Sequence, residues 1–277
     1  MLTQTYTDLE IVIADQNSSD RSLDIVRSFV DSRVRILPNP TDSLDLHGNW
    51  NRAVQAAMGD FVKLVGQDDV LLPQCISIQL ELLRESPEAA LTCGRRRIID
   101  DRGRTFISAR GLGKFAKDRN HQFVTGPEVA REVVRSGENL LGEPANVLMR
   151  RALLPRSLFD PNWLYVIDLE FYLRCLQNGG AVIDRRVVCC FRVSPQQLSA
   201  QLSRSQAREV QELLRVIAQR YPNCVTEHDL RKGAARAWLL SLIRRSLYRV
   251  MKLRTALSAS DATDVSDQLG TRGDLTR

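Results

Sequence analysis

Two adjacent carboxylates, Asp68 and Asp69, are the part of this chain whose types and spacing most clearly indicate chemistry. They end an apolar run over residues 61–65, and a second apolar turn then leads to Pro73. Carboxylates at the mouth of a buried strand cost free energy unless a positive group meets them. A divalent cation carrying a nucleotide diphosphate is the usual partner, because hard cations take oxygen ligands and bridge phosphates. The alternative is a polar turn in which an aspartate caps the helix at Pro73.

A third carboxylate, Asp15, follows the strand predicted over Leu9–Ala14 and begins a polar loop. Open α/β sheets bind ligands at the carboxyl ends of their strands, which is where this spacing puts Asp15. Asp20 or Ser19 can cap the helix that follows. We expect Asp15 either to contact a ligand or only to order the loop.

Several segments with matched spacing resemble the family 2 glycosyltransferases, which have the GT-A fold. The first three are QTYTDLEIVI (4–13), ADQNSSD (14–20) and GDFVKLVGQDD (59–69). HGNWNRAVQAAMG (47–59) resembles the helix that the family places before the last of these segments. The resemblance extends over roughly residues 1–199. It implies an α/β fold with a mixed, mostly parallel sheet flanked by helices, and a nucleotide-diphospho sugar as donor.

The resemblance also implies roles for the donor end of the site. Asp15 matches the carboxylate that accepts a hydrogen bond from the nucleotide base. Asp68 matches the metal-holding aspartate, whose Mg²⁺ or Mn²⁺ also binds the donor diphosphate, and Asp69 is a second candidate ligand or a residue that holds the loop. Asn51, on the 47–59 helix, is a further donor-binding candidate.

The stretch FDPNWLYVIDLEFYLRCLQNGG (159–180) resembles the family segment that contains the catalytic base. By that resemblance Asp168 deprotonates the acceptor hydroxyl, and Glu170 is the alternative base. In a helix that begins here, Asp168 lies in the first turn, where the helix dipole favours an acid without any catalytic role. The implied reaction inverts the anomeric centre, since a single base and a metal-stabilised leaving group are enough for in-line attack.

Other matched positions bear on the acceptor and on activity. Glu143, in GEPANVLMRR (142–151), matches the segment that lines the acceptor site, and the acceptor is a glycan or a lipid-linked hydroxyl in cell-surface polysaccharide synthesis. Ala14, Gly66 and Ser194 stand where the family often has Asp, Asp and His. These departures support an alternative, namely an inactive GT-A domain that binds a nucleotide or a protein partner.

The family places a strand and a helix before the segment that begins at Gln4. That strand lies beside the strand expected over Leu9–Ala14, which is apolar throughout, as strands buried on both faces are. We therefore expect an N-terminally truncated GT-A domain with an open strand edge, poorly soluble on its own, unless the region after Ser203 or a second subunit covers that edge.

Composition indicates a globular protein with a substantial core. Hydrophobic residues make up 43% of the 277 residues, and the net charge is +6. No apolar run approaches the ~20 residues that a membrane span needs. The six cysteines form no CxxC pair, which favours reduced, buried thiols and a cytoplasmic location, with the inner face of the membrane as an alternative.

Strand-like and helix-like segments alternate over the first two hundred residues, as in α/β proteins. We expect a catalytic domain over 1–203, a helical region over 204–257 and a disordered tail over 258–277, with a long loop or flap at 101–126. The expected helices are 22–31, 49–58, 73–85, 127–136 and 168–178. The expected strands are 9–14, 34–37, 61–65, 90–93, 145–149 and 187–192.

Residues 230–257 read as one amphipathic helix with an apolar face of Leu239, Ile243, Leu247, Val250 and neighbouring residues. Residues 230–254 contain eight Lys or Arg and no acid. The helix either packs on the catalytic domain with its basic face in water or binds an anionic membrane surface, as basic amphipathic helices do. Nucleic acid is not an expected partner, since no recognition motif accompanies the charge.

Overall fold

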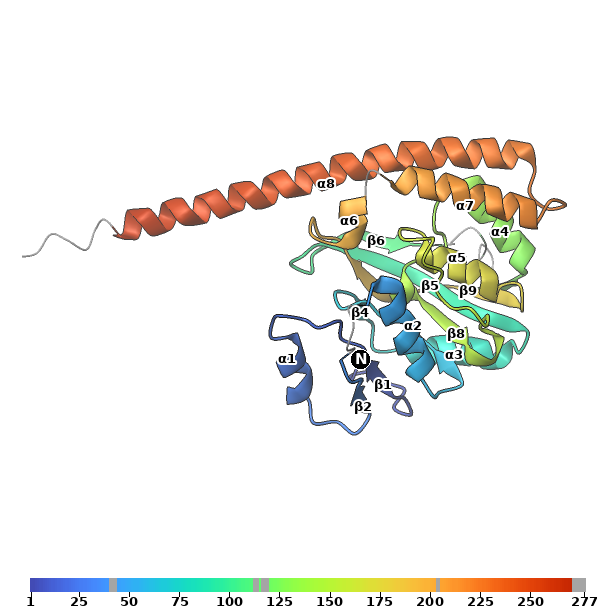
Figure 1. The fold of residues 1–277 in the computed structure, drawn as a ribbon, viewed down its shortest axis with the longest axis horizontal. Helices are drawn as coiled ribbons and strands as arrows, with labels where there is room; N and C mark the ends of the chain where they lie inside the picture. Colours follow the sequence, from blue (N-terminus) through green and yellow to red (C-terminus); the bar gives the residue numbers. More distant parts are fainter. Residues whose placement is uncertain (40–43, 112–114, 116–119, 203–204, 271–277) are drawn as a thin grey trace, which may run out of the picture.

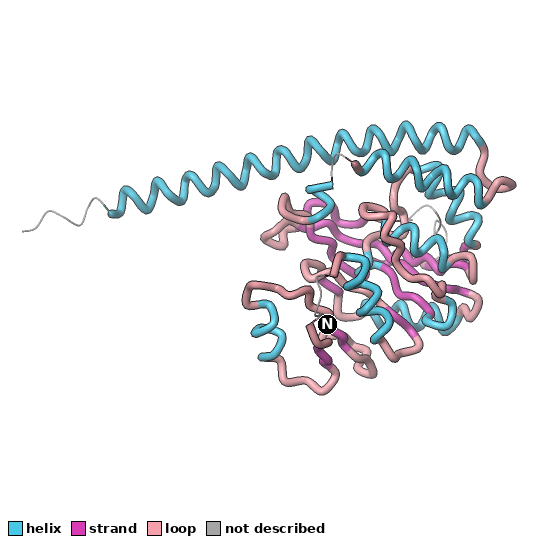
Figure 2. Tube along the Cα trace, viewed as in Figure 1, coloured by secondary structure: helices cyan, strands magenta, loops and turns pink. Residues whose placement is uncertain are grey.

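The computed structural model describes residues 1–39, 44–111, 115, 120–202 and 205–270, with side chains up to Met251. It is a mixed α/β protein in which helices flank a central sheet (Figures 1 and 2). The helices are α1 (Ser22–Ser28), α2 (Leu46–Ala56), α3 (Cys75–Glu85), α4 (Gly126–Ser136), α5 (Ile167–Cys175), α6 (Leu198–Gln201), α7 (Gln206–Arg220) and α8 (Glu227–Gly270), with short 3-10 turns at η1 (Pro144–Asn146) and η2 (Arg151–Leu153). The strands are β1 (Ile11–Ile13), β2 (Val34–Ile36), β3 (Phe61–Val62), β4 (Val70–Leu71), β5 (Ala89–Ile99), β6 (Thr105–Arg110), β7 (His121–Val124), β8 (Val147–Arg150) and β9 (Gly180–Arg192).

The larger sheet has seven strands in the order β3-β8-β5-β9-β4, with β6 on β5 and β7 on β9. The predicted α/β class with flanking helices is confirmed, but the expected mostly parallel pairing is corrected. In the described sheets only β5–β9 and β1–β2 are parallel, and the other pairs are antiparallel. The reason is connection length in part: β5 and β6 are joined by a turn over 100–104, and such short connections permit only antiparallel neighbours.

One continuous core joins the sheet to helices that precede residue 203, such as α5, and to helices that follow it, such as α7. It includes Leu91 of β5, Phe171 of α5 and Ile183 of β9, together with Leu213 and Leu214 of α7. All of these side chains are at most 2% exposed. Helix α7 therefore shares its apolar face with the catalytic sheet, which is the arrangement that buries most apolar surface for a helix of this pattern.

The segment 101–126, expected as a loop or flap, contains two strands. β6 pairs with β5, and β7 pairs with β9 through Phe123 opposite Val182. Residues 112–114 and 116–119 lie outside the described residues. The Gly, Arg and Lys content hid the strands because β6 has no buried residue, so it lacks the apolar alternation of a half-buried strand.

Strands β1 and β2 form a sheet of their own with parallel register, Ile11 opposite Val34. Among the described strands, β1 pairs only with β2, and β3 pairs only with β8. Residues of β1 and of the segment 61–65 line the same cavity, so the two sheets face each other across it. In Figure 1 this small layer, with α1, lies beside the larger sheet.

Helix α8 crosses α4 and α7 through its small residues. Gly233, Ala237 and Ser241 recur every four residues and are buried, and a Cβ on Gly233 would lie 1.7 Å from the carbonyl oxygen of Val134. The helix backbone continues to Gly270 (Figure 1), so the structure differs from the expected disorder over 258–270. The chain from 234 to 269 contains no Pro or Gly, the residues that most often end a helix. The last seven residues, 271–277, lie outside the described part.

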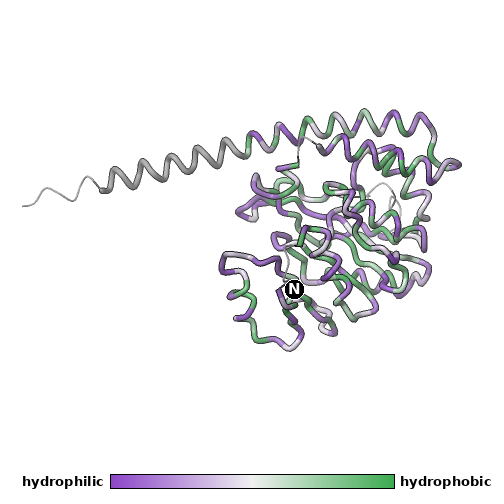
Figure 3. The backbone as a smooth tube through the Cα atoms, in the orientation of Figure 1, coloured by the Kyte–Doolittle hydropathy of each residue, from purple (hydrophilic) through white to green (hydrophobic). Residues whose placement is uncertain are grey.

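Within the described residues, none of the helices combines the length and apolar content needed to cross a membrane. In Figure 3 the coloured part of α8 carries hydrophilic and hydrophobic residues along its whole length. The six cysteines are free thiols, and five of them are buried.

Candidate active site

A single cavity of about 1800 Å³ contains most of the residues singled out from the sequence. Asp15, Asp68, Asp69, Glu143 and Asp168 all line it. They come from the end of β1, the loop after β3, the segment before η1 and the first turn of α5. Strand-end and helix-start positions from distant parts of the sequence therefore converge at one place, as ligand sites of open α/β sheets do.

Asp15 sits at the end of β1 and orders the loop after it. Its carboxylate accepts hydrogen bonds from the backbone N–H and the hydroxyl of Ser18, at 2.9 and 2.6 Å. Burial alone would raise the pKa of Asp15, but the Ser18 hydrogen bonds outweigh it and hold the pKa below its usual value. Asp15 is thus an anion that has hydrogen-bond partners in the protein and still borders the cavity.

Asn51 does not reach the cavity. Its side-chain oxygen accepts from the backbone N–H of Phe159 at 2.8 Å, and its nitrogen donates to the Phe159 carbonyl at 3.3 Å. The prediction that Asn51 binds the donor is therefore corrected: its amide holds a loop. Asn49, two residues earlier on α2, lines the cavity and donates to the carbonyl of Ala14 at 3.0 Å.

The Asp68 and Asp69 carboxylates converge around Gly66. A Cβ built on Gly66 would lie 3.2 Å from Asp68 Oδ1 and 3.6 Å from Asp69 Oδ2, so both carboxylates lie beside the position of the missing side chain. Asp69 Oδ1 also accepts from the backbone N–H of Arg192 at 3.1 Å. Burial, together with the neighbouring carboxylates Asp68 and Glu143, raises the pKa of Asp69 to about 7 despite that hydrogen bond.

Arg192 fixes this acidic loop from the end of β9. Its Nε donates to the carbonyl of Asp68 at 3.0 Å, and its Nη1 donates to the carbonyls of Asp100 and Asp101. The guanidinium is therefore occupied by backbone carbonyls, and among the described residues no Lys or Arg side chain forms an ion pair with Asp68 or Asp69.

This arrangement fits a magnesium or manganese ion bound partly by its substrate. Among the described residues, no cluster of three or more His, Cys, Asp or Glu side chains could hold a metal alone. Mg²⁺ is commonly bound through one or two carboxylates plus substrate phosphates, and Asp68 and Asp69 supply that number. A cation here would also relieve the repulsion between two carboxylates that burial and proximity make costly.

Asp168 lies in the first turn of α5 and borders the cavity. Its Oδ2 accepts from the amide nitrogen of Asn139 at 3.0 Å. Burial and, to a smaller extent, the nearby Glu143 carboxylate raise the pKa of Asp168 to about 7, although the Leu169 backbone N–H and Arg96 lower it. A carboxylate with a pKa close to neutrality is suited to general-base catalysis, because a substantial fraction is ionised near pH 7 and that form is basic enough to accept a proton.

Glu170 is not available as a base. It is 6% exposed, and both of its oxygens accept from Arg174 Nε, at 2.8 and 2.9 Å. Arg174 in turn donates to the carbonyls of Ser157 and Leu158. Glu170 does not line the cavity, so its prediction as the alternative base is corrected. Two positions along a helix turn a side chain by about 200°, which directs Asp168 and Glu170 to opposite faces.

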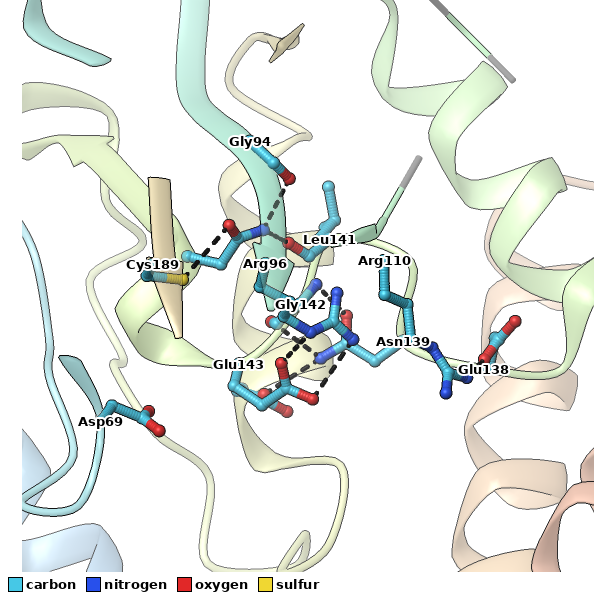
Figure 4. A network of polar contacts seen from close by, with 12 residues as sticks. Asp69, Gly94, Arg96, Arg110, Glu138, Asn139, Leu141, Gly142, Glu143 and Cys189 are labelled. Atoms are coloured by element: carbon cyan, nitrogen blue, oxygen red, sulfur yellow. Dashed lines mark hydrogen bonds and ion pairs between the residues drawn. The ribbon is translucent and has the colours of Figure 1, made fainter. Parts of the chain in front are cut away.

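Arg96 and Glu143, which both line the cavity, form an ion pair (Figure 4). Arg96 is 4% exposed, and its Nη2 donates to Glu143 Oε1 at 3.2 Å. Figure 4 shows Glu143 between Asp69 and the Arg110–Glu138 ion pair. Glu143 raises the pKa of both Asp69 and Asp168, so its carboxylate couples the acidic loop to the residue in α5.

Sequence reasoning missed several residues of this site, among them Asn139, Arg96 and Asn49. Ser194, considered earlier for its departure from the family pattern, does not line the cavity; its N–H donates to Gln197 Oε1 at 2.6 Å. Asn139 had no motif around it, and its role emerges only because residues 139–142 form a turn in which it bonds both the N–H and the carbonyl of Gly142.

The mixed α/β sheet with its flanking helices is the GT-A fold of glycosyltransferases. The chain matches the family described as "Glycosyl transferase family 2" over residues 1–155, and it belongs to that family. The predicted family membership is therefore confirmed.

Two relatives show how far the similarity extends. The Mycobacterium tuberculosis protein "Uncharacterized protein MT1568" is 30% identical over 190 residues, which are 65% of this chain and 56% of that protein. The Campylobacter jejuni "GalNAc(5)-diNAcBac-PP-undecaprenol beta-1,3-glucosyltransferase" is 32% identical over 84 residues, 30% of this chain and 27% of that enzyme. The chain thus spans little more than half the length of the first relative and about a quarter of the second.

Among solved structures, Staphylococcus aureus TarS 1-349 in complex with UDP superposes with a TM-score of 0.57 at 18% identity, over 85% of this chain and 64% of TarS 1-349. The Pyrobaculum calidifontis mannosyltransferase PcManGT in complex with GDP-Man and Mn²⁺ gives a TM-score of 0.50 at 15% identity, over 98% of this chain and 74% of PcManGT. At these identities the likeness establishes the fold.

Proposed function

We propose that this protein transfers a sugar, with inversion, from a nucleotide-diphospho sugar to a hydroxyl of a glycan or lipid-linked acceptor in cell-surface polysaccharide synthesis. The observation that supports it is the placement of Asp168 and of the Asp68–Asp69 loop on one cavity, where Glu143 raises the pKa of both Asp69 and Asp168. Asp15 and Asn49 border the same cavity at the end of β1, where the donor nucleotide would lie.

In this reaction Asp168 accepts the proton of the acceptor hydroxyl while that oxygen attacks the anomeric carbon. The bond from the anomeric carbon to the diphosphate oxygen breaks on the opposite face, and the nucleoside diphosphate leaves with the bonding electrons. Asp68 and Asp69 would hold the Mg²⁺ or Mn²⁺ ion, which supplies Lewis-acid stabilisation of the diphosphate charge. Asn139 keeps the base oriented through its hydrogen bond to Oδ2.

The location that we propose is cytoplasmic, at the inner face of the membrane, with α8 as the contact to an anionic lipid surface. Leu239, Ile243 and Val250 lie on one face of α8 and are 52%, 55% and 47% exposed. Helix α8 also packs on α4 and α7 through its small residues, as the expected alternative has it, but these three apolar side chains lie outside that contact. The name of the Campylobacter jejuni relative describes a glucosyltransferase for an undecaprenol-linked glycan, which supports a membrane-surface reaction here.

A second candidate is a GT-A domain that binds a nucleotide without transferring sugar. Gly66 stands at a position beside which both carboxylates of the loop lie, so the site has one carboxylate fewer than an Asp there would provide. Such a protein would bind a nucleoside diphosphate weakly and release none from a sugar nucleotide.

Both candidates can be separated by incubating the chain with UDP-glucose, UDP-N-acetylglucosamine or GDP-mannose, with Mn²⁺ or Mg²⁺ and an undecaprenyl-diphosphate-linked N-acetylglucosamine acceptor. Nucleoside diphosphate release and the anomeric configuration of the product, read by NMR, are the measurements. The proposal predicts acceptor-dependent release and an inverted product from at least one donor. Nucleoside diphosphate binding without any release would support the second candidate, and retention at the anomeric carbon would contradict the mechanism.

A further inference from the structure

The helix that contains Asp168 begins without a cap of its own. Its N-cap residue is Val166, which has no polar side chain, and no side-chain cap bond is present there. The first backbone N–H groups of a helix lack partners within the helix and need an acceptor from elsewhere. Asp168 Oδ1 accepts from the N–H of Leu169 at 2.7 Å, and the N–H of Val166 takes its acceptor from another part of the chain.

Glu209, in the first turn of α7, supplies the acceptor for the N-cap residue Val166 and for the two residues before it. One oxygen, Oε2, accepts from the backbone N–H groups of Leu164, Tyr165 and Val166, at 2.9, 2.5 and 3.0 Å. Hydrogen bonds to an ionised acceptor are roughly twice as strong as bonds between neutral groups. A negative charge at a helix start is also favoured by the helix dipole. One side chain thus fixes three consecutive peptide groups.

The segment before α5 has a second polar contact, on the side of α2. His47 Nε2 contacts the carbonyl of Trp163 at 2.6 Å, on the side facing α2. Glu209 holds the following three residues from the side of α7, and Asp168 comes two residues after the last of them. The direction of the Asp168 carboxylate is set by this turn together with the Asn139 hydrogen bond.

We propose that Glu209 is a positioning residue for the transfer reaction: it holds residues 164–166 so that Asp168 presents its carboxylate to the cavity. The inference rests on the proposed function, in which Asp168 is the base. It makes the region beyond residue 203 part of the catalytic unit, because the carboxylate that orders the base-bearing turn comes from α7. A misplacement of a reacting group by about 1 Å can cost about 100-fold in rate.

The test compares Glu209→Ala, which removes the acceptor, with Glu209→Gln, which keeps a carbonyl oxygen at that position. Glu212→Ala on the exposed side of the same helix is the matched control, since it removes the same charge and gains the same helix propensity. With the donor and acceptor that the wild-type protein uses in the transfer assay, we expect Glu209→Ala to lower kcat about 10- to 100-fold. The donor Kd should change less than about twofold. Glu209→Gln should recover part of kcat, and Glu212→Ala should match wild type.

A second readout does not require activity: the pKa of Asp168, followed by carbon-13 NMR of aspartate-labelled protein. The charged or titratable groups around Asp168 are Arg96, Glu143, Tyr165 and Tyr172, and none of the variants changes them. Glu209→Ala opens the turn to water and removes an anion. Because burial is the largest cause of the raised pKa, we expect it to fall toward the usual aspartate range, and Glu212→Ala should leave it unchanged.

The two readouts separate the possible failures. A wild-type protein that transfers no sugar overturns the proposed function, while the NMR titration still decides whether Glu209 controls Asp168. An Asp168 pKa that is the same in wild type and both Glu209 variants overturns the positioning role. Equal losses of kcat in Glu209→Ala and Glu209→Gln, with an unchanged Asp168 pKa and a lowered Tm, would show that Glu209 contributes only to the stability of the fold. If Glu209→Ala does not fold, Glu209→Gln carries the same comparison.

Discussion

The amide nitrogen of Asn139 lies 3.0 Å from Oδ2 of Asp168, although 29 residues separate them in the sequence. Asn139 is itself held by Gly142, whose N–H donates to the Asn139 oxygen at 3.0 Å and whose carbonyl accepts from its nitrogen at 3.0 Å. Gly142 has a φ of +96°, which a side chain would strain, so this turn requires glycine. The Asp168 carboxylate thus has a hydrogen-bond partner in a turn that has no acid or metal motif of its own.

Replacing Asn139 by Ala should therefore lower kcat about tenfold or more while leaving donor binding nearly unchanged, since the carboxylate loses its orienting donor. Steady-state kinetics and calorimetric donor titration measure the two quantities. Asn178→Ala is the matched control, because Asn178 makes a comparable bond to the Leu153 carbonyl away from the cavity. Equal effects of the two substitutions on kcat would contradict a role of Asn139 in orienting Asp168.

The raised pKa of Asp168 has a cost in stability with a definite pH dependence. A folded-state pKa of about 7, above the usual 3.8, means that the folded protein binds this proton more tightly than the unfolded chain. Its contribution favours folding at low pH, is lost as the pH rises from about 4 to about 7, and stays lost above that. Asp168→Asn mimics the protonated form, so it should raise Tm at pH 8 and change it little at pH 4.5.

Thermal melts of wild type and Asp168→Asn at both pH values measure this difference. Asp160→Asn, at a position outside the cavity, is a control for the loss of a carboxylate from the same segment. A Tm gain for Asp168→Asn that is equal at the two pH values, or larger at pH 4.5, would contradict the raised pKa.

Binding of nucleoside diphosphate should depend on a divalent cation and on Asp68. Asp68→Asn keeps the size of the side chain but removes the charge that attracts the cation. We expect calorimetry with UDP or GDP and Mn²⁺ to show a loss of affinity of about tenfold or more, that is ~1.4 kcal/mol or more, with Tm nearly unchanged in the absence of Mn²⁺. Asp8→Asn, which also lines the cavity but away from the acidic loop, is the control. Identical nucleoside diphosphate affinity of Asp68→Asn and wild type in the presence of Mn²⁺ would contradict the proposal that Asp68 holds the metal.

The exposed apolar face of α8 predicts binding to anionic vesicles. Changing Leu239, Ile243 and Val250 together to Ser should weaken co-sedimentation with phosphatidylglycerol-containing vesicles about tenfold or more, because each buried apolar group contributes to interfacial binding. Added salt should weaken wild-type binding as well, since exposed cations such as Arg249 attract the lipid charge. Changing the exposed Ile25, Phe29 and Val30 near α1 to Ser is the control. A loss of vesicle binding of the same size in that control would exclude a specific role for α8.

The sequence allowed much of the site to be predicted because strand ends and helix starts are local features. Asp15, Asp68 and Asp69 follow apolar runs, and the rule that ligands bind at strand ends places them at one cavity. Asp168 follows from the family resemblance, and the structure brings it to the same cavity. The roles of these residues stay predictions, because their position alone does not test them.

Other residues could not be identified in this way. Whether Asn49 or Asn51 faces the cavity, and whether Asp168 or Glu170 does, depends on the rotation of a helix about its axis, which packing sets. Glu209 acts through backbone N–H groups 43 to 45 residues away, so no local pattern marks it. The strands within 101–126 were missed because β6 is exposed and the pairing that defines it is with β5.

The central claim, that Asp168 is the base of an inverting transfer reaction, is tested most directly by the transfer rate of Asp168→Asn measured beside Glu170→Gln. Asn keeps the shape and the Asn139 contact but cannot accept the proton. Asp168→Asn should lower transfer by about 100-fold or more with donor binding nearly unchanged. Wild-type kcat/KM should fall as the pH drops through about 7, where Asp168 becomes protonated. Asp168→Asn with near wild-type transfer, and Glu170→Gln without it, would contradict the account.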